Sequence, residues 1–526
     1  MYSQRNPQYS GEDIFIDDYS SLPKALYSAQ AVREMDRIAI EDHNIDGFEL
    51  MTKAARFSFH SLIKQWPDTQ NLIILCGSGN NAGDGYIVAA LAKKRSWNVN
   101  VFFASSPEKL TGAALQAYQE CIRSKVNCES FNLDRFDKLC KSRNLVIVDA
   151  LLGTGLNSDV KGIYADMIGA ANLVNIPKMA IDIPSGLSAN TGQVLGVALE
   201  ADLTASFIGL KLGLFTGSGR QYSGKIVFSQ LDLEDNFFEH IEAAANILDL
   251  DILLRALPMR QRNAHKGSCG HTMIIGGDIA YGGAVILAAM ASTRMGSGLT
   301  TVLTQEAHRS ALLTSIPEAM VFCSQSMQDI EQILTKANVI IIGPGLGKSA
   351  WSEKLLLAAI NSGKPLVIDA DALNILSNQF LSASEFELFK LNNHVFTPHP
   401  GEAARMLQLS SEEVQFDRLN TVKALQNKWG GSILLKGSGS LICSKDNKLT
   451  LCPYGNPGMA SGGMGDVLSG LVGGLIAQGL QQDYALQLAV CLHAKAADIA
   501  SKQCGERGLL ASDLIPIARR LLNNTL

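Results

Sequence analysis

The sequence predicts two α/β domains joined by a linker. Two observations carry this prediction: short apolar runs that favour strands alternate with helical patterns, and most of these runs are followed by polar or glycine-rich residues. Such alternation is typical of parallel sheets covered by helices. The alternation breaks between Gly224 and Asp251, where residues 231–245 are acidic and then alanine-rich and carry no strand pattern. We therefore expect the linker there.

The first α/β series begins at residues 71–76, an apolar run that predicts a strand. The glycine-rich turn 77–85 follows, and residues 86–94 have a helical pattern. Further strands are expected at 99–103, 145–148 and 179–181. The second series predicts strands at 272–275, 299–303, 339–342, 365–368, 394–396 and 432–435. The expected division is a tail over 1–24, a first domain over 25–235 and a second over 245–526, which are ordinary domain sizes.

Composition narrows the class of protein. Of the 526 residues, 47% are hydrophobic and 18% are charged, with a net charge of -5, which argues against a disordered chain, a coiled coil and a nucleic-acid-binding tail. The ten cysteines include no CxxC pair, so we expect them to be reduced. The first 20 residues lack an apolar core, and no window has about 18 uninterrupted apolar residues. We expect a cytoplasmic protein without nucleic-acid or membrane partners.

A glycine-rich loop, CGSGNNAGDG over residues 76–85, connects the first predicted strand to a helix. Backbone amides at such a helix start favour an anion. The spacing Gly77-x-Gly79-x-x-x-Gly83 differs from GxGxxG, and no acidic residue follows the strand 99–103. Both differences argue against an ordinary NAD dehydrogenase, although the loop alone is also compatible with a plain tight turn. The paired Asn80 and Asn81 add amide oxygens for a cation or a ligand hydroxyl.

Two further strand ends should lie beside this loop, because ligands of open α/β sheets bind at the carboxyl ends of strands. One is DALLGTGL, from Asp149 to Leu156, and the other is DIPSG, from Asp182 to Gly186. Asp182 is a candidate general acid or base, while Asn80, Asp149 and Ser185 offer oxygens to a hard cation. In the alternative interpretation, the two aspartates only cap the helices that follow them.

The strongest motif of the second domain is GNPGMASGGMGDVLSG, over residues 455–470. Its glycines precede an apolar helical run, where backbone amides can neutralise a phosphoryl group in transfer. Asp466, at that helix start, can accept a proton from an attacking hydroxyl. No Walker motif GxxxxGK[ST] occurs in the chain. The alternative is a flexible loop before a core helix.

Other predicted strands of the second domain are also followed by polar or glycine-rich segments that are candidates for the same site. The segment KGSGS, from Lys436 to Ser440, follows one strand and is a candidate contact for nucleotide phosphate and ribose. GPGLG at 343–347 and TPHPGE at 397–402 follow two others. His399 alone is ambiguous between a structural and a site residue, and Lys436 alone is compatible with a surface lysine. Beside a phosphoryl site, both become site candidates.

In this order, the first three motifs resemble the N-terminal domain of NAD(P)H-hydrate epimerases, over residues 25–235. This family interconverts the R and S epimers of hydrated NAD(P)H and binds potassium. The resemblance implies a Rossmann-like three-layer domain with Asp182 at the reacting ring and Asn80, Asp149 and Ser185 as potassium ligands. The implied dinucleotide contacts are Gly79, Asn80, Asn81, Ala82, Gly83, Gly153, Thr154, Gly155, Leu156, Asn157, Ser158 and Asp159. Ala82 stands where the family often has glycine.

The later motifs resemble ADP/ATP-dependent NAD(P)H-hydrate dehydratases, which have a ribokinase-like fold, over residues 245–526. In that family, phosphorylation turns the ring hydroxyl into a phosphate that can leave, which restores NAD(P)H. The resemblance assigns Asp466 as the base and Mg²⁺ as the bridge between phosphates. The implied contacts to the hydrated cofactor are Ala284, Gly345, Gly347, His399 and Asp466. Those to the adenine nucleotide are Lys436, Gly437, Ser438, Gly439, Ser440 and Gly465.

The fusion resembles the bacterial bifunctional repair enzymes, and this likeness alone makes ADP, rather than ATP, the expected phosphoryl donor. The dehydratases act on the S epimer, so an attached epimerase makes both epimers repairable. The expected partners are hydrated NADH and NADPH, an adenine nucleotide and further copies of the chain. Two alternatives stay open: a ribokinase-type enzyme that phosphorylates a sugar or vitamin alcohol, and a non-enzymatic binding protein.

Overall fold

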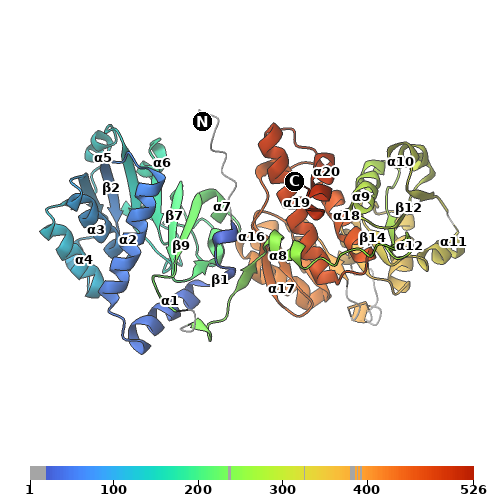
Figure 1. Ribbon diagram of the computed structural model, residues 1–526, viewed down its shortest axis with the longest axis horizontal. Coiled ribbons are helices and arrows are strands. Elements are labelled where there is room, and N and C mark those ends of the chain that lie inside the picture. Colours follow the sequence, from blue (N-terminus) through green and yellow to red (C-terminus); the bar gives the residue numbers. More distant parts are fainter. Residues whose placement is uncertain are drawn as a thin grey trace.

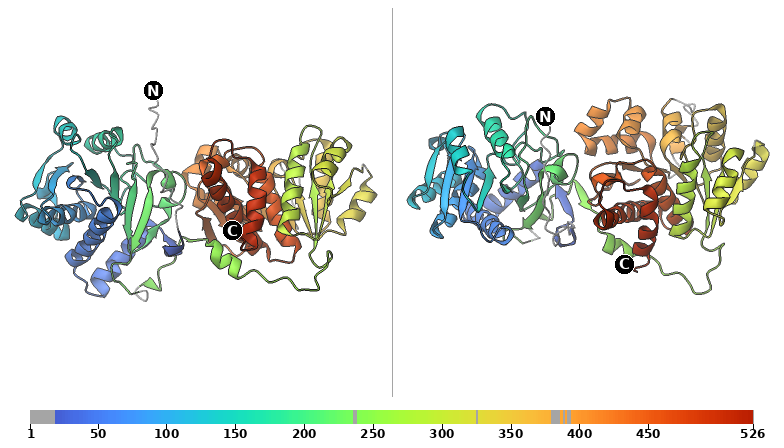
Figure 2. Two further views of the ribbon diagram at one scale, coloured as in Figure 1. Left: turned by 45° about the horizontal axis from the view of Figure 1, so that its top comes forward. Right: turned by 90° about the horizontal axis from the view of Figure 1, so that it is seen from above.

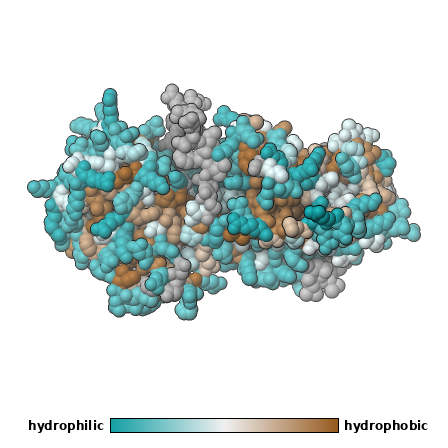
Figure 3. Space-filling view, in the orientation of Figure 1, coloured by the Kyte–Doolittle hydropathy of each residue, from teal (hydrophilic) through white to brown (hydrophobic). Residues whose placement is uncertain are grey.

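The computed structural model describes residues 19–234, 238–324, 326–378, 386–387, 389–390 and 394–525. These residues form two lobes that lie end to end (Figure 1), and two further views show the same arrangement (Figure 2). The described strands make one sheet of seven and one of twelve strands. Hydrophilic side chains cover most of the face seen in Figure 3, and apolar ones gather there in a few patches.

The N-terminal lobe has three layers around a seven-stranded, wholly parallel sheet of order β4-β3-β2-β5-β6-β7-β9. Alternate residues of β2 explain the layers: Leu72 and Ile74 face one core, and Ile73 and Leu75 face the other. The strands are β2 (Asn71–Cys76), β3 (Asn98–Phe103), β4 (Asn127–Ser130), β5 (Leu145–Ala150), β6 (Lys178–Ile181), β7 (Leu203–Phe207) and β9 (Lys225–Ser229). One face packs against α2 (Gly47–Gln65), α3 (Asn80–Lys94) and α4 (Gly112–Arg123), the other against α5 (Leu133–Leu139) and α6 (Ile163–Leu173).

The C-terminal lobe is also a three-layer α/β structure. Its parallel strands are β11 (His271–Ile275), β12 (Leu299–Leu303), β13 (Met320–Phe322), β14 (Val339–Ile342), β15 (Leu366–Ile368), β16 (Val395–Phe396) and β17 (Ser432–Leu435), and β18 (Ser440–Cys443) and β19 (Leu449–Cys452) continue the sheet antiparallel. One face packs against α9 (Gly282–Met295), α10 (Arg309–Ser315), α18 (Met464–Ala477), α19 (Gln482–Cys504) and α20 (Ala511–Leu522). The other packs against α11 (Met327–Leu334), α12 (Ala350–Asn361), α13 (Ala370–Ser377), α15 (Pro400–Leu407), α16 (Ser411–Phe416) and α17 (Arg418–Trp429). The predicted α/β class is therefore confirmed in both lobes.

The sheet of the C-terminal lobe extends into the N-terminal lobe. Beyond β19 it continues through β10 (Ala245–Ile247), β1 (Ala25–Tyr27) and β8 (Leu210–Lys211). Strand β1 pairs antiparallel with β10 and parallel with β8, so the edge of β19 is covered rather than exposed. The expected break in the α/β pattern between Gly224 and Asp251 is only partly found, because β9 and β10 both lie in this interval. Strands β10 and β8, with three and two residues, carry too short a pattern to be recognised in the sequence, whereas the five-residue β9 was missed.

Shorter elements complete the described chain: α1 (Ala29–Arg37), α7 (Gly219–Tyr222), α8 (Leu250–Arg255), a π turn at Ile38–Asp42 and 3₁₀ turns that include Tyr19–Ser21 and Leu212–Leu214. Of the predicted tail, residues 1–18 lie outside the described residues. Tyr19 is buried, and its ring packs edge-on against Phe215 of the N-terminal lobe and Tyr454 of the C-terminal lobe. Among the described residues, every helix is too short or too polar to cross a membrane.

Two candidate active sites

The start of α18 forms the centre of the C-terminal site. Gly463, with φ +88°, is the N-cap residue, and Asp466 lies in the first turn. A Cβ atom added to Gly465 would lie 3.3 Å from Nζ of Lys436 and 3.4 Å from Oδ2 of Asp369. Helix α18 therefore brings its unpaired backbone amides close to a buried ion pair, which is an arrangement suited to phosphoryl charge.

The ion pair joins Lys436, after β17, to Asp369, after β15. Lys436 Nζ lies 2.8 Å from Oδ1 of Asp369, and the hydroxyl of Ser469 donates to Oδ2 at 2.8 Å. Glu402 is 3.9 Å from the ammonium. Burial lowers the pKa of Lys436, but the charges of Asp369, Glu402 and Asp466 outweigh burial and raise it overall. Lys436 thus stays positively charged at neutral pH.

Asp466 is placed to exchange a proton near neutral pH. Burial, followed by the negative charge of Asp369, raises the pKa of Asp466 from 3.8 to about 7, while Lys436 acts in the opposite direction. A general base works best when its pKa lies near the working pH. The surroundings of Asp466 therefore fit the role predicted from its position in the sequence.

His399 and Glu402 close one side of this site. Nδ1 of His399 accepts from the amides of Gly401 (3.0 Å) and Glu402 (3.4 Å), and Glu402 accepts from the His399 amide at 2.8 Å. This reciprocal pattern caps α15. Burial, then the charges of Lys436 and Arg405, lowers the pKa of His399, so its ring is neutral at pH 7. His399 has a structural role as well as a place beside Lys436.

The loop 343–347, which we predicted to contact the hydrated cofactor, lies on another side of the C-terminal site. Gly345 has φ +56°, and a Cβ there would lie 3.2 Å from Cβ of Ala284, so these two predicted contacts adjoin each other. Gly347 donates its amide to Oδ2 of Asp371 at 3.0 Å. Asp371 also contributes to the raised pKa of Asp466. The structure thus brings the predicted residues around α18 together.

In the N-terminal lobe, Asp182 follows β6 with φ +70°, a left-handed conformation that aspartate tolerates better than most residues. Its carboxylate forms an ion pair with Lys211 of β8. Nζ of Lys211, which is fully buried, also donates to Oγ of Ser206 (3.1 Å) and the carbonyl of Phe207 (3.1 Å). Asp182 is thereby held in one position at the carboxyl edge of the sheet.

Two more carboxyl groups, those of Asp36 and Asp84, lie close enough to Asp182 and Lys211 for their charges to interact. Burial, then the charge of Asp182, raises the pKa of Asp36 to about 6. Burial also raises the pKa of Asp84 well above its usual range, with Asp182 and Asp36 adding to the effect. Of these three carboxyl groups Asp84 is buried and Asp36 and Asp182 are half-buried, and the single ammonium of Lys211 does not offset the raised pKa values of Asp36 and Asp84. Carboxyl groups with separated pKa values are typical of acid–base sites.

Beside this cluster lies a set of oxygens suited to a cation. Asp149 is buried and accepts from the Ser185 hydroxyl (2.6 Å), the Ser185 amide (2.8 Å) and the Leu151 amide (3.1 Å). Burial raises the pKa of Asp149 to about 6, so it is largely ionised at pH 7. Oδ1 of Asn81 is buried and has no hydrogen-bond partner. A Cβ on Gly153 would touch both Asn81 and Asp182, so the two groups adjoin.

The other residues predicted for the N-terminal site differ in their exposure to solvent. Gly79 and Asn80 are exposed at the start of α3, whereas Ala82 and Gly83 are buried. A Cβ on Gly83 would lie 2.5 Å from Sδ of Met51, so this glycine serves packing against α2. The loop after β5 is mostly open: Gly155, Asn157, Ser158 and Asp159 are exposed, and Gly153, Thr154 and Leu156 are half-buried.

Several residues of the two sites were missed in the sequence: Asp36, Asp84, Lys211, Asp369, Asp371, Glu402 and Ser469. Asp369 directly follows the predicted strand 365–368, so the strand-end rule that selected Asp149 and Asp182 should have found it. Lys211 lies on a strand of two residues and has no comparable signal.

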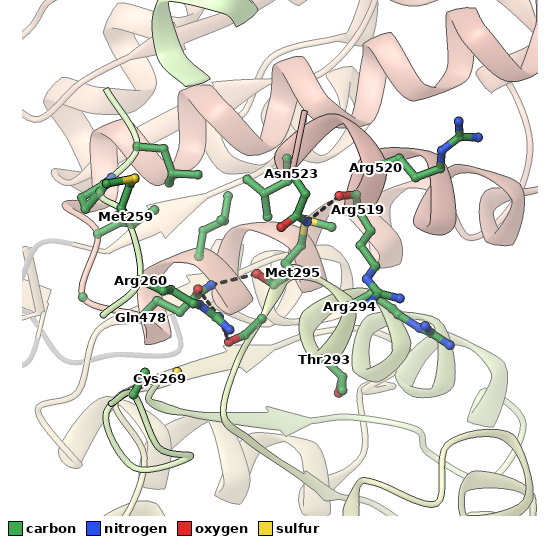
Figure 4. Close-up of a pocket in the computed structure, with 18 of the residues that line it drawn as sticks. Met259, Arg260, Cys269, Thr293, Arg294, Met295, Gln478, Arg519, Arg520 and Asn523 are labelled. Carbon is green, nitrogen blue, oxygen red and sulfur yellow. Dashed lines mark hydrogen bonds between the residues drawn. The ribbon is translucent and has the colours of Figure 1, made fainter. Parts of the chain in front are cut away.

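A groove of about 1790 Å³ lies at the opposite ends of α9 and α18 (Figure 4). Its walls include Arg260, Met295 and Gln478, and Arg519 and Arg520 of α20. None of the predicted site residues lines this groove. Because Met295 ends α9 and Gln478 follows α18, the groove is about one helix length away from Asp466.

Comparison with known sequences identifies the family. A family model described as NAD(P)H-hydrate dehydratase matches residues 272–520, and one described as YjeF-related protein N-terminus matches residues 47–213. The bifunctional NAD(P)H-hydrate repair enzyme Nnr of Coxiella burnetii is 42% identical over 500 residues, which cover 95% of this chain and 99% of that protein. This chain belongs to the bifunctional NAD(P)H-hydrate repair enzymes. The repair enzyme Nnr of Escherichia coli is 38% identical over 503 residues, 96% of this chain and 95% of that one.

Membership of the repair-enzyme family confirms the prediction of an enzyme with an epimerase and a dehydratase domain. Solved structures align with one part of this repair enzyme. A ribokinase-like superfamily protein from Enterococcus faecalis is 30% identical, covers 54% of this chain and 95% of its own, and has a TM-score of 0.48. The ADP/ATP-dependent NAD(P)H-hydrate dehydratase of Bacillus subtilis, co-crystallized with ATP/Mg2+, is 26% identical, covers 53% and 98%, and has a TM-score of 0.47.

Proposed function

We propose that the N-terminal site interconverts the R and S epimers of hydrated NADH and NADPH, and that the C-terminal site dehydrates the S epimer at the expense of ADP or ATP. The products are NAD(P)H, phosphate and AMP or ADP. The observation that carries the proposal is Asp466, a carboxyl group with a pKa of about 7 in the first turn of α18, beside the Lys436–Asp369 pair.

In the proposed dehydratase reaction, Asp466 accepts the proton of the ring hydroxyl. The hydroxyl oxygen forms a bond to the terminal phosphorus, and the bond from that phosphorus to the nucleotide breaks. Backbone amides at the start of α18, with Lys436, stabilise the charge in transfer. The phosphate then leaves with the C–O electron pair, and a proton lost from the neighbouring ring carbon restores the double bond.

Magnesium is proposed for the same site. Among the described residues, no three histidine, cysteine or acidic side chains are grouped as a metal cage. Mg²⁺ is commonly held by one or two carboxylates together with substrate phosphates. Asp371, whose charge acts on Asp466, is the carboxylate that we propose to hold it. When bound, Mg²⁺ would neutralise phosphate charge.

For the epimerase site, we propose that Asp182 exchanges a proton with the hydrated ring and that Lys211 holds Asp182 in place through their ion pair. We assign potassium to Asn80, Asp149 and Ser185. The buried, ionised Asp149, whose three hydrogen-bond donors are neutral, and the unpaired Oδ1 of Asn81 support a cation here, because a buried charge favours a countercharge and a buried acceptor is costly without a partner. We therefore add Asn81 to the proposed ligands. Potassium would supply the charge that balances Asp149.

The test supplies a mixture of both hydrated epimers with ADP or ATP and follows NADH absorbance. Complete conversion supports both activities, once spontaneous epimerisation has been subtracted. Asp182→Asn should make conversion stop at the S fraction, and Asp466→Asn should abolish NADH formation while R-to-S exchange continues. Conversion that stops at the S fraction in the wild type would refute the epimerase assignment. No conversion with either nucleotide would refute the dehydratase assignment.

We also retain three predictions about the whole protein. The domain bounds are 25–235 and 245–526, the chain forms a homo-oligomer, and it is cytoplasmic. Size-exclusion chromatography with light scattering would test the oligomeric state.

A further inference from the structure

The proposed nucleotide turn, residues 436–440, is packed against the other lobe. Gly439 has φ +64°, and a Cβ there would lie 2.0 Å from the carbonyl oxygen of Phe215 in the N-terminal lobe. Gly437 has φ +140°, and a Cβ there would lie 2.9 Å from Nη1 of Arg418. The two glycines of KGSGS are therefore required by these close neighbours, whatever the turn binds.

Arg418, at the start of α17, is buried and holds this turn from beneath. Its guanidinium donates to the carbonyls of Leu435 (3.2 Å), Lys436 (3.3 Å) and Gly439 (3.5 Å), to Oε1 of Gln415 (2.7 Å) and to Oγ1 of Thr216 (3.2 Å). Burial lowers the pKa of Arg418 to about 10, so it remains charged at neutral pH. The hydrogen bond to Thr216 crosses from the C-terminal lobe to the N-terminal lobe.

A second arginine, Arg220, extends from the N-terminal lobe to the C-terminal lobe. Arg220, in α7 of the N-terminal lobe, donates to the carbonyl of Tyr454 (3.3 Å) and to that of Gly455 (2.9 Å). Gly455 begins the glycine-rich segment that leads to α18. One stretch of the N-terminal lobe, residues 215–220, therefore contacts both loops that we propose to hold the nucleotide.

These contacts have a consequence for binding. A turn rich in glycine has many conformations, and a ligand that must order it loses affinity. The planar guanidinium of Arg418 holds two carbonyls of the turn and that of Leu435, just before it, which a lysine ammonium, as a point charge, cannot reproduce. Thr216 in turn holds Arg418. The turn is thus ordered before a nucleotide arrives, and part of that order comes from the N-terminal lobe.

We propose that Arg418 is a positioning residue for nucleotide binding in the dehydratase site, and that it depends on Thr216, so that the epimerase lobe sets the nucleotide affinity of the dehydratase lobe. The inference rests on the proposed binding of the nucleotide at residues 436–440.

The test uses the full chain and measures two quantities: the Kd for ADP by calorimetry, and KM and kcat for ADP with the S epimer. Thr216→Val removes the hydroxyl at nearly constant volume and should raise Kd and KM about three- to tenfold, as expected for the loss of one ordinary hydrogen bond that acts on the turn through Arg418. Arg418→Met should raise them by more than about tenfold, and Arg418→Lys should lie between the two. At saturating ADP, kcat should change less than about twofold, because Arg418 lies beneath the turn and acts through binding.

Lys24→Met is the matched control. It removes a different contact between the lobes, the 2.8 Å ion pair of Lys24 with Asp249, which does not touch the turn. Its Kd for ADP should equal that of the wild type. Retained epimerase activity and an unchanged unfolding temperature show that each variant is folded. If Arg418→Met does not fold, Thr216→Val decides.

The proposal is overturned if Thr216→Val and Arg418→Lys bind ADP as tightly as Lys24→Met, or if they lower kcat with Kd unchanged. Lys436→Met separates this failure from failure of the proposed function. If Lys436→Met weakens ADP binding but the other two variants do not, only the positioning role is wrong. If Lys436→Met also leaves ADP binding unchanged, the nucleotide does not bind at this turn and both proposals fail.

Discussion

Replacing Asp466 by asparagine should stabilise the C-terminal lobe while it abolishes dehydration. The native surroundings of Asp466 oppose its ionised form and raise its pKa from 3.8 to about 7. In the unfolded chain this opposition is absent. Ionised Asp466 therefore costs folding free energy, which an uncharged asparagine of the same shape does not.

The size of the gain follows from the pKa difference. The pKa rises by about 3 units, and one unit corresponds to about 1.4 kcal/mol, so the cost in the wild type is about 4 kcal/mol at pH 8. The native state binds the proton more tightly than the unfolded state, so the cost falls as the pH is lowered. It is about 1.5 kcal/mol at pH 5, where the native carboxyl is protonated, and it vanishes below about pH 4. The advantage of Asp466→Asn should therefore grow by about 2.5 kcal/mol from pH 5 to pH 8.

Thermal unfolding at the two pH values measures this advantage. At about 2 °C per kcal/mol for a lobe of this size, the difference in Tm between Asp466→Asn and the wild type should be about 5 °C larger at pH 8 than at pH 5. Asp446→Asn, in the exposed turn between β18 and β19, is the matched control and should show no such change. A difference in Tm that is the same at both pH values, or a variant less stable than the wild type at pH 8, would refute the electrostatic account of Asp466.

Three other outcomes are expected. Lys211→Met should abolish R-to-S conversion and lower Tm, because it leaves the partly buried carboxylate of Asp182 without its cation. Consumption of the R epimer at the wild-type rate would contradict this role of Lys211. The dehydratase kcat/KM should fall about tenfold per pH unit below about pH 7, because the Asp466 base becomes protonated. Asp369→Asn removes a neighbouring negative charge and should move this decline to lower pH. A profile that is flat down to pH 5 would exclude Asp466 as the base. Exchange of potassium for sodium should slow the epimerase but not the dehydratase, and Ser185→Ala should weaken the response to potassium; equal rates in both salts would contradict a potassium site.

The positions of Asp466, Asp182 and Asp149 could be predicted because Asp149 lies near the carboxyl end of β5, Asp182 directly follows β6 and Asp466 lies in the first turn of α18. The carboxyl ends of parallel strands meet at one edge of a sheet, so a local pattern is enough to indicate that these residues converge. The same rule applied to residues 365–368 would also have indicated Asp369.

Lys211, Asp36 and Arg418 could not be found in this way. Lys211 lies on a two-residue strand, Asp36 reaches the site from α1, and Arg418 acts through carbonyls of a turn that begins 18 residues later. Their importance comes from contacts between segments far apart in the chain. The glycines of KGSGS show the same limit: they were interpreted only as nucleotide contacts, and the structure adds Phe215 and Arg418 as steric reasons for them.

By itself, the sequence determined the α/β class, the strand ends that carry the acidic residues and the likeness to a two-domain repair enzyme, because hydrophobic periodicity and glycine-rich turns are local properties. Only the tertiary structure decided which charges surround each carboxyl group and how the two lobes share one sheet. Desolvation and charge–charge interaction depend on distances through space, and those distances are set by packing between segments that the local sequence does not relate.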